Sequence, residues 1–254
     1  MMMGRKTVHF RRSSQAEFAR QFTHLCNTKR SWEVWADFVT MSAISIANAF
    51  DQQGKTHDER EKEYLNLISH YTKAEQRIFP ELFAKLVEGL EEDPAQDFLG
   101  EIFMVLDLAN HWKGQVFTSY PVCKLMAAIT IEDRVLRIQN RGWDSICDPC
   151  CGAGVLLIAA RNEMIKRGLG PRQMLYVAQD IDRTAALMCY LQLSLLGCAG
   201  YVIVGDSLSQ PLAGPTESPL LFVPTREHWL MPALYDEVWV CRIQCERARQ
   251  YAKK

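Results

Sequence analysis

The segment SICDPCCGAGVLLIAA, residues 145–160, restricts this chain to a narrow set of folds. A short apolar stretch ends at Cys147, Gly152 and Gly154 follow, and apolar residues at helical spacing begin at Val155. Glycines at such a turn let the backbone pass close to a ligand, and the N-terminus of the helix behind it favours anionic groups. The segment therefore predicts a strand, a binding turn and a helix of an α/β sheet.

The sequence after residue 112 continues this alternation. Strands are predicted over 143–147, 174–180, 200–206 and 235–241, with helices over 154–168 and 182–197. Strands that alternate with helices at this spacing are typical of a parallel, doubly wound sheet. The C-terminal part is therefore expected to be a Rossmann-like α/β domain.

The first half of the chain has a different pattern, in which apolar residues recur at helical spacing and no strand-like alternation occurs. Helices are predicted over 31–50, 56–74, 79–92 and 94–110, with Pro80 and Pro94 near the starts of the last two. We predict a helical N-terminal domain, residues 1–111, followed by the α/β domain, residues 112–254.

Three cysteines near the turn allow a second interpretation. Cys147 and Cys150 have the spacing of half a zinc site or of a redox pair at the start of a helix. Neither alternative explains the Asp148–Pro149 pair between them or the two glycines after them. A cofactor turn explains all of these residues, and no metal is predicted.

Acidic residues follow the next two predicted strands. Asp180 ends the second strand, and Gly205 and Asp206 end the third. The carboxyl ends of parallel strands meet at one edge of the sheet, where an acidic side chain can accept both hydroxyls of a ribose. The pattern predicts a nucleoside-bearing cofactor at this edge.

Several ordered motifs resemble those of N6-adenine DNA methyltransferases, especially the modification subunits of type I restriction systems. DPCCGAG (148–154) is similar to the family's D-P-x-C-G-x-G motif, and GQVFTSYPVCKLM (114–126) to its G-Q-F-F-T-P-x-x-V-x-x-L-M motif. QDFLGEIF (96–103), AQDID (178–182) and GDSL (205–208) fall at the other expected places. The resemblance covers about residues 94–208.

The resemblance implies S-adenosylmethionine as the cofactor. Phe117, Thr118 and the turn would hold its methionine end, Asp180 would bind the ribose, Ile181 would pack on the adenine, and Asp206 would accept from the adenine amino group. The cofactor-binding residues implied are Phe117, Thr118, Asp148, Pro149, Cys151, Gly152, Gly154, Asp180, Ile181 and Asp206.

The chain departs from the family at two places. Ser119 replaces a proline of the upstream motif, and the catalytic N-P-P-F/Y tetrapeptide, whose polar groups and aromatic ring bind the flipped adenine, is not in the sequence. CRIQ (241–244) stands where it is expected, after the predicted fourth strand. No catalytic residue is identified, and the resemblance implies a methyltransferase sheet truncated after its fourth strand.

Three functions remain open: a restriction-modification adenine methyltransferase, a catalytically silent cofactor-binding subunit or regulator, and a scaffold. The formal net charge is −1, yet residues 1–30 hold seven Lys/Arg against one acid, and the last thirteen residues hold five against one. These basic ends make DNA a candidate partner. An open sheet edge at the fourth strand predicts a protein partner or self-association.

The expected location is the cytoplasm. No apolar segment is long enough for a membrane helix, the N-terminus lacks the apolar stretch of a secretory signal, and the nine cysteines suit a reducing compartment.

Overall fold

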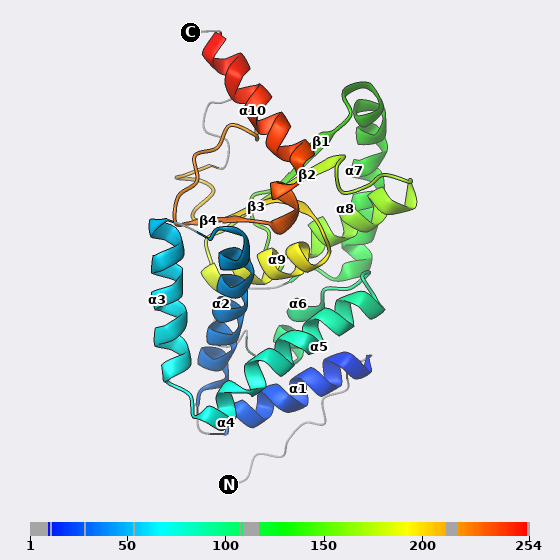
Figure 1. Ribbon diagram of the computed structural model, residues 1–254. Helices are drawn as coiled ribbons and strands as arrows, with labels where there is room; N and C mark the ends of the chain where they lie inside the picture. The colour runs from blue at the N-terminus through cyan, green and yellow to red at the C-terminus, as the bar shows by residue number, and fades with distance from the viewer. Residues whose placement is uncertain are drawn as a thin grey trace.

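The computed structural model describes residue 10, residues 12–27, 29–52, 54–106, 108, 117–211 and 218–252. Its N-terminal helices gather on one side of a small sheet, and the last helix lies on the other side (Figure 1). The N-terminal helices are α1 (Ser13–Leu25), α2 (Ser31–Phe50), α3 (Lys55–Ser69), α4 (Lys73–Gln76), α5 (Ile78–Glu92) and α6 (Phe98–Val105).

The sheet has the order β1-β2-β3-β4. Strands β1 (Asp144–Asp148), β2 (Met174–Asp180) and β3 (Ala199–Val204) are parallel, and β4 (His228–Leu230) is antiparallel to β3. The remaining elements are α7 (Tyr120–Arg141), α8 (Val155–Lys166), α9 (Arg183–Leu195), the 3₁₀ helix η2 (Pro232–Tyr235) and α10 (Glu237–Ala252).

The two faces of the sheet pack into separate cores because side chains alternate along each strand. Tyr176 and Ala178 of β2 join the larger core, together with α8, α9 and the N-terminal helices. Leu175 and Val177 join a smaller core on the opposite face, which includes Trp239 of α10.

Helix α9 lies between the sheet and the N-terminal helices. All of its residues from Ala185 to Ser194 are buried. Trp35 of α2 donates from Nε1 to the sulfur of Met188 on α9, at 3.4 Å. A continuous apolar core therefore joins the helical half to the sheet.

The first three predicted strands are confirmed, with small shifts at their ends. The second has the predicted bounds, the first begins and ends one residue later, and the third ends at Val204, so that Asp206 follows it in a loop. The helices after β1 and β2 are also confirmed. The sheet is mixed rather than wholly parallel, because it includes the short antiparallel strand β4, which was not predicted.

The predicted strand over 235–241 is wrong: Tyr235 ends η2, and the residues from Glu237 onward are helical. Asp236 explains the difference, because its carboxylate accepts the N–H of Val238 at 2.9 Å and its carbonyl accepts the N–H of Val240. The apolar residues that follow are spaced for a helix, with Trp239 buried beneath it. Among the described residues the sheet edges are thus β1 and β4, and residues 235–241 are not an edge strand.

The predicted helical half is confirmed over the described residues. Residues 56–74 form two helices instead of one, and the helix predicted from Pro94 begins at Phe98, where Asp97 caps it. The predicted domain boundary at 111 and 112 lies outside the described residues.

Gly200 in β3 provides a test of the close contact between β2 and β3. A Cβ on Gly200 would overlap the backbone carbonyl of Tyr176 in β2, whereas a Cβ on Gly197 would meet nothing within 4 Å. Gly197 has φ of +73°, so Gly197→Ala should cost about 1 kcal/mol of unfolding free energy through backbone strain alone. Gly200→Ala should cost more, about 2–4 kcal/mol, because the two strands must separate. Urea denaturation of both variants measures the difference, and equal losses would contradict this account of the strand contact.

Candidate functional site

The turn between β1 and α8 depends on two glycines with left-handed backbones. Gly152 has φ of 53° and Gly154 has φ of 93°. A Cβ on Gly154 would lie 2.8 Å from Sγ of Cys189 on α9. Glycine is therefore required there both for the backbone and for close packing of the turn on α9.

Asp180, the last residue of β2, is bonded to this turn. One carboxylate oxygen accepts the N–H of Gly152 at 2.8 Å, and the other accepts the N–H of Asp182 at 2.9 Å. A carboxylate has about four acceptor positions, so each oxygen keeps capacity for a further donor. The acid predicted to bind ribose and the predicted cofactor turn thus form one unit.

Asp148, the last residue of β1, lies at the same edge. Its carboxylate accepts the N–H of Cys150 at 3.1 Å, across Pro149. Burial raises the pKa of Asp148, and the nearby negative charge of Asp180 raises it further. The sulfur of Cys150 lies 3.8 Å from the hydroxyl of Ser207, which ties the turn to the loop after β3.

Ile181 and Asp206 complete the predicted edge. Ile181 is 73% exposed although it is apolar, as a residue that covers an adenine would be. Asp206 accepts from the N–H of Leu208 and the hydroxyl of Ser209, both at 2.9 Å. These two bonds hold the pKa of Asp206 below its usual value, so it is an acceptor at neutral pH.

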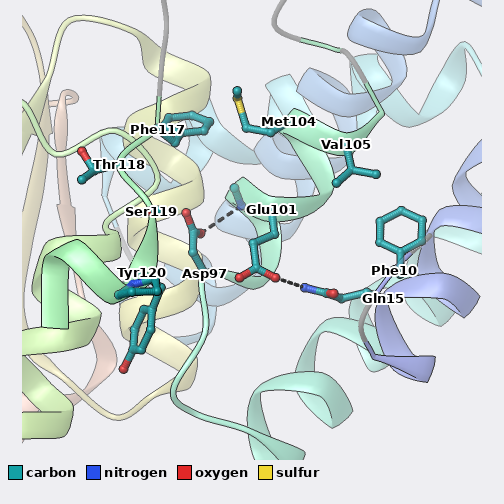
Figure 2. A pocket seen from close by; sticks show the side chains of 12 residues that line it. Phe10, Gln15, Asp97, Glu101, Met104, Val105, Phe117, Thr118, Ser119 and Tyr120 are labelled. Carbon is teal, nitrogen blue, oxygen red and sulfur yellow. Dashed lines mark hydrogen bonds between the residues drawn. The ribbon is translucent and has the colours of Figure 1, made fainter. Parts of the chain in front are cut away.

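Phe117 and Thr118 border a cavity of about 370 Å³ between α1, α6 and the start of α7 (Figure 2). The ring of Phe117 lies 3.0 Å from the position that a Cβ of Gly152 would take, and its centroid is 5.6 Å from that of Phe103 on α6. Phe117 therefore stands between the cavity and the glycine turn. The first three residues of the 114–126 motif lie outside the described residues.

Cys147 near the end of β1 and Cys151 in the turn have different environments. Cys147 is exposed as a whole residue, yet partial desolvation together with the charge of Asp148 raises its pKa, which disfavours a reactive thiolate. Cys151 is buried, its N–H bonds to the carbonyl of Gln179 at 2.9 Å, and its thiol interacts with Cys189. Over the described ranges, no three His, Cys, Asp or Glu side chains gather as metal ligands.

Sequence reasoning missed Asp97, whose carboxylate lines the cavity beside Phe117. Asp97 is 3% exposed and caps α6 by accepting the N–H of Gly100 at 2.9 Å. The same oxygen accepts the side-chain amide of Gln192 on α9 at 2.8 Å, and this amide also donates to the carbonyl of Ala153 at 2.9 Å. The acidic residue just before an apolar helix was the available signal, but a cap alone accounts for that pattern.

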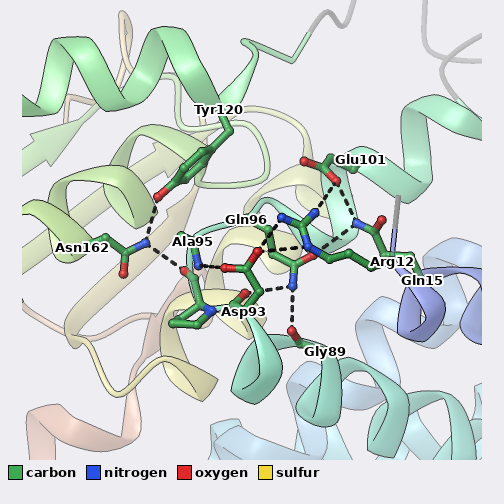
Figure 3. Close-up of polar contacts among 10 residues, drawn as sticks. Arg12, Gln15, Gly89, Asp93, Ala95, Gln96, Glu101, Tyr120 and Asn162 are labelled. Atoms are coloured by element: carbon green, nitrogen blue, oxygen red, sulfur yellow. Dashed lines mark hydrogen bonds and ion pairs between the residues drawn. The ribbon is translucent and has the colours of Figure 1, made fainter. Parts of the chain in front are cut away.

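A polar network holds residues 93–101, the segment that contains Asp97 (Figure 3). Arg12, the residue before α1, donates to Asp93 at 2.6 Å and to Glu101 at 3.3 Å, which joins the start of α1 to both ends of the segment. Asn162 of α8 donates to the carbonyl of Pro94 at 2.8 Å. The start of α1, helix α6 and helix α8 thus hold this segment in place beside the cavity.

The residues of this edge fit S-adenosylmethionine by their chemistry. Asp180 can accept from ribose hydroxyls, the exposed Ile181 suits an adenine face, and the N-terminus of α8, which no side chain caps, favours a carboxylate.

The segment expected to hold the catalytic tetrapeptide lies elsewhere. Residues 241–244 are part of α10, which packs on the smaller core behind the sheet. Arg242 of this helix packs on the ring of Trp239 at 4.6 Å, and Arg249 pairs with Glu246, so these predicted DNA contacts also have partners within the chain. Arg5, Lys6, Arg11, Lys253 and Lys254 lie outside the described residues.

No helix in the described part of the chain is both long and apolar enough to cross a membrane. No curated protein sequence matches the chain. A solved structure with similarity to it is the type I restriction-modification methyltransferase subunit from Streptococcus thermophilus, at 13% identity and a TM-score of 0.39. That alignment covers 82% of this chain and 60% of the solved subunit.

A family model described as N-6 DNA methylase matches residues 95–229. The match begins before the cap of α6, includes the glycine turn with its acidic strand ends, and spans just over half of the 254 residues. The chain therefore belongs to the N-6 DNA methylase family.

Proposed function

We propose that the chain binds S-adenosylmethionine at the carboxyl ends of β1, β2 and β3, and that the bound cofactor is used for adenine N6 methylation of DNA. The bond from the N–H of Gly152 to Asp180 carries this proposal, because it joins the glycine turn, which would hold the methionine end, to an acid suited to the ribose. Membership of the N-6 DNA methylase family supports methylation of DNA as the reaction that the site serves.

Removal of the ribose acceptor tests the cofactor site. Asp180→Ala should weaken S-adenosylmethionine binding at least about 10-fold, because hydrogen bonds to a charged group are lost. Isothermal titration calorimetry measures the affinity, with thermal unfolding as a check that the variant is folded. Asp58→Ala, at an acid of α3 whose side chain is 72% exposed, is the matched control and should bind normally. Failure of the unaltered protein to bind would overturn the proposal and favour a scaffold role.

We propose further that these residues hold the cofactor without completing methyl transfer, because the sequence contains no N-P-P-F or N-P-P-Y segment. The groups that orient the adenine amino nitrogen would come from a partner polypeptide, and the edge strand β1 is where a partner strand would pair with the sheet.

The 254 residues alone should therefore give no methyl incorporation into unmethylated DNA. Transfer from cofactor labelled with tritium in its methyl group measures this directly, against a reaction without protein. Incorporation that Asp180→Ala abolishes would instead make the chain an active adenine methyltransferase by itself, with an acceptor site built from other residues.

DNA is the proposed macromolecular partner through the basic ends. Arg20 of α1 and Arg247 of α10 are exposed representatives of these two segments. Binding through such residues is dominated by phosphate contacts, so affinity should fall steeply as salt rises from about 50 to about 200 mM. Fluorescence anisotropy with a labelled duplex measures it, and affinity independent of salt would exclude this mode of contact.

A further inference from the structure

The cavity of about 370 Å³ beside Phe117 has an anionic wall. Asp97, the cap of α6, and Glu101, in the first turn of that helix, both line it (Figure 2). Glu101 is paired with Arg12 at 3.3 Å and accepts from Gln15 at 2.8 Å. Among the described residues no ion pair reaches Asp97, and its hydrogen bonds come from neutral donors, the N–H of Gly100 and the amide of Gln192.

The carboxylate of Asp97 is held in the cavity at a cost to stability. Burial, together with the charge of Glu101, raises its pKa to about 6. Gly100 provides its space, because a Cβ there would overlap Oδ2 of Asp97. A buried anion without a cation destabilises the folded state, and such groups concentrate at binding and catalytic sites.

The cavity lies next to the glycine turn, with the ring of Phe117 between them. The ring of Phe117 contacts the position of a Gly152 side chain at 3.0 Å, and Gln192 links Asp97 to the carbonyl of Ala153. A ligand that extends from the turn past the ring of Phe117 would therefore reach Asp97. The methionine end of S-adenosylmethionine carries an ammonium group, which supplies the missing positive charge.

We infer that Asp97 accepts the α-ammonium group of S-adenosylmethionine in this cavity. The inference rests on the proposed function and adds a binding residue that the sequence motifs do not assign. The amino group, held on Asp97, would fix the methionine end while Asp180 binds the ribose, so that two acids would bind two different parts of one ligand.

The variant Asp97→Asn tests this assignment with little change in shape, because asparagine also caps helices and can accept from Gly100 and Gln192. It should weaken S-adenosylmethionine binding about 10- to 100-fold in calorimetry. It should leave 5′-methylthioadenosine binding unchanged, because that molecule has the adenine, ribose and sulfur but no amino acid group. Asp58→Asn is the matched control: the side chain of Asp58 is 72% exposed on α3, and its variant should bind both ligands normally.

Stability provides a second readout that a capping role alone would not give. The folded-state pKa of Asp97 lies above its ordinary value of 3.8, so the folded protein binds this proton more tightly than the unfolded chain does. The contribution of Asp97 to stability is therefore favourable at low pH and is lost as pH rises through about 6. Asp97→Asn should raise the unfolding temperature at pH above about 7, and the gain should shrink towards pH of about 4.

The neighbouring titratable groups are Glu101 on the same helix, which Arg12 neutralises, and Cys123 on α7, whose pKa is raised to about 11. The difference between the unaltered protein and Asp97→Asn isolates the contribution of Asp97 to the pH dependence.

The possible outcomes separate the two claims. If the unaltered protein binds neither ligand, the proposed function fails, and this inference fails with it. If it binds both and Asp97→Asn does so with equal affinity, the role of Asp97 is overturned while the cofactor site stands. Equal weakening of both ligands would also overturn it, because the residue would then act on the shape of the site.

Discussion

Gln192 lies fully buried on α9 and uses its side-chain amide to join three parts of the molecule. It donates to Asp97 and to the carbonyl of Ala153, and it accepts the N–H of Leu99 at 3.1 Å. A buried amide that lost these partners would cost roughly 1–3 kcal/mol for each unsatisfied group. The position of the α6 cap relative to the glycine turn therefore depends on one side chain from a third element, and the proposed cofactor site is built across that link.

Local sequence was sufficient to predict the strand–turn–helix unit around Gly152 and Gly154. The φ values and the space that these glycines require are properties of a few consecutive residues, so the pattern is visible without a structure. The position of Asp180 at the carboxyl edge of the sheet was likewise predictable, because an acid at the end of a parallel strand has a fixed place in the fold. Asp97 was not, because its burial depends on α9 and on the 117–121 segment, which are distant in sequence.

The error at residues 235–241 has a different origin. YDEVWVC is short and apolar, and its alternation fits a strand as well as the start of a helix. Asp236 followed by Glu237 is a helix-start signal, and the cap bond from Val238 shows that the chain uses it. A longer window, extended to Ala252, would have favoured the helix, because the apolar positions after Trp239 no longer alternate.

The cysteine cluster shows why spacing alone does not identify a thiol site. Cys147 and Cys150 are exposed and Cys151 is buried, and the sulfur contacts of Cys150 and Cys151 lie on different elements, Ser207 after β3 and Cys189 on α9. The structure uses the turn's backbone, through the N–H groups of Cys150, Cys151 and Gly152, to connect the strand ends. The role of the segment is therefore carried by its amides rather than its sulfurs.

Burial of α9 on both sides also has a consequence for folding. The helix has sheet residues on one side and α2 on the other, and from Ala185 to Ser194 none of its side chains reaches solvent appreciably. Neither half of the chain can bury this helix alone, so the helical half and the sheet should gain stability together, in one cooperative transition. A change from a helical pattern to a strand–helix pattern along a sequence therefore need not mark a boundary between independently folding units. A single helix that both parts bury can join them into one folding unit.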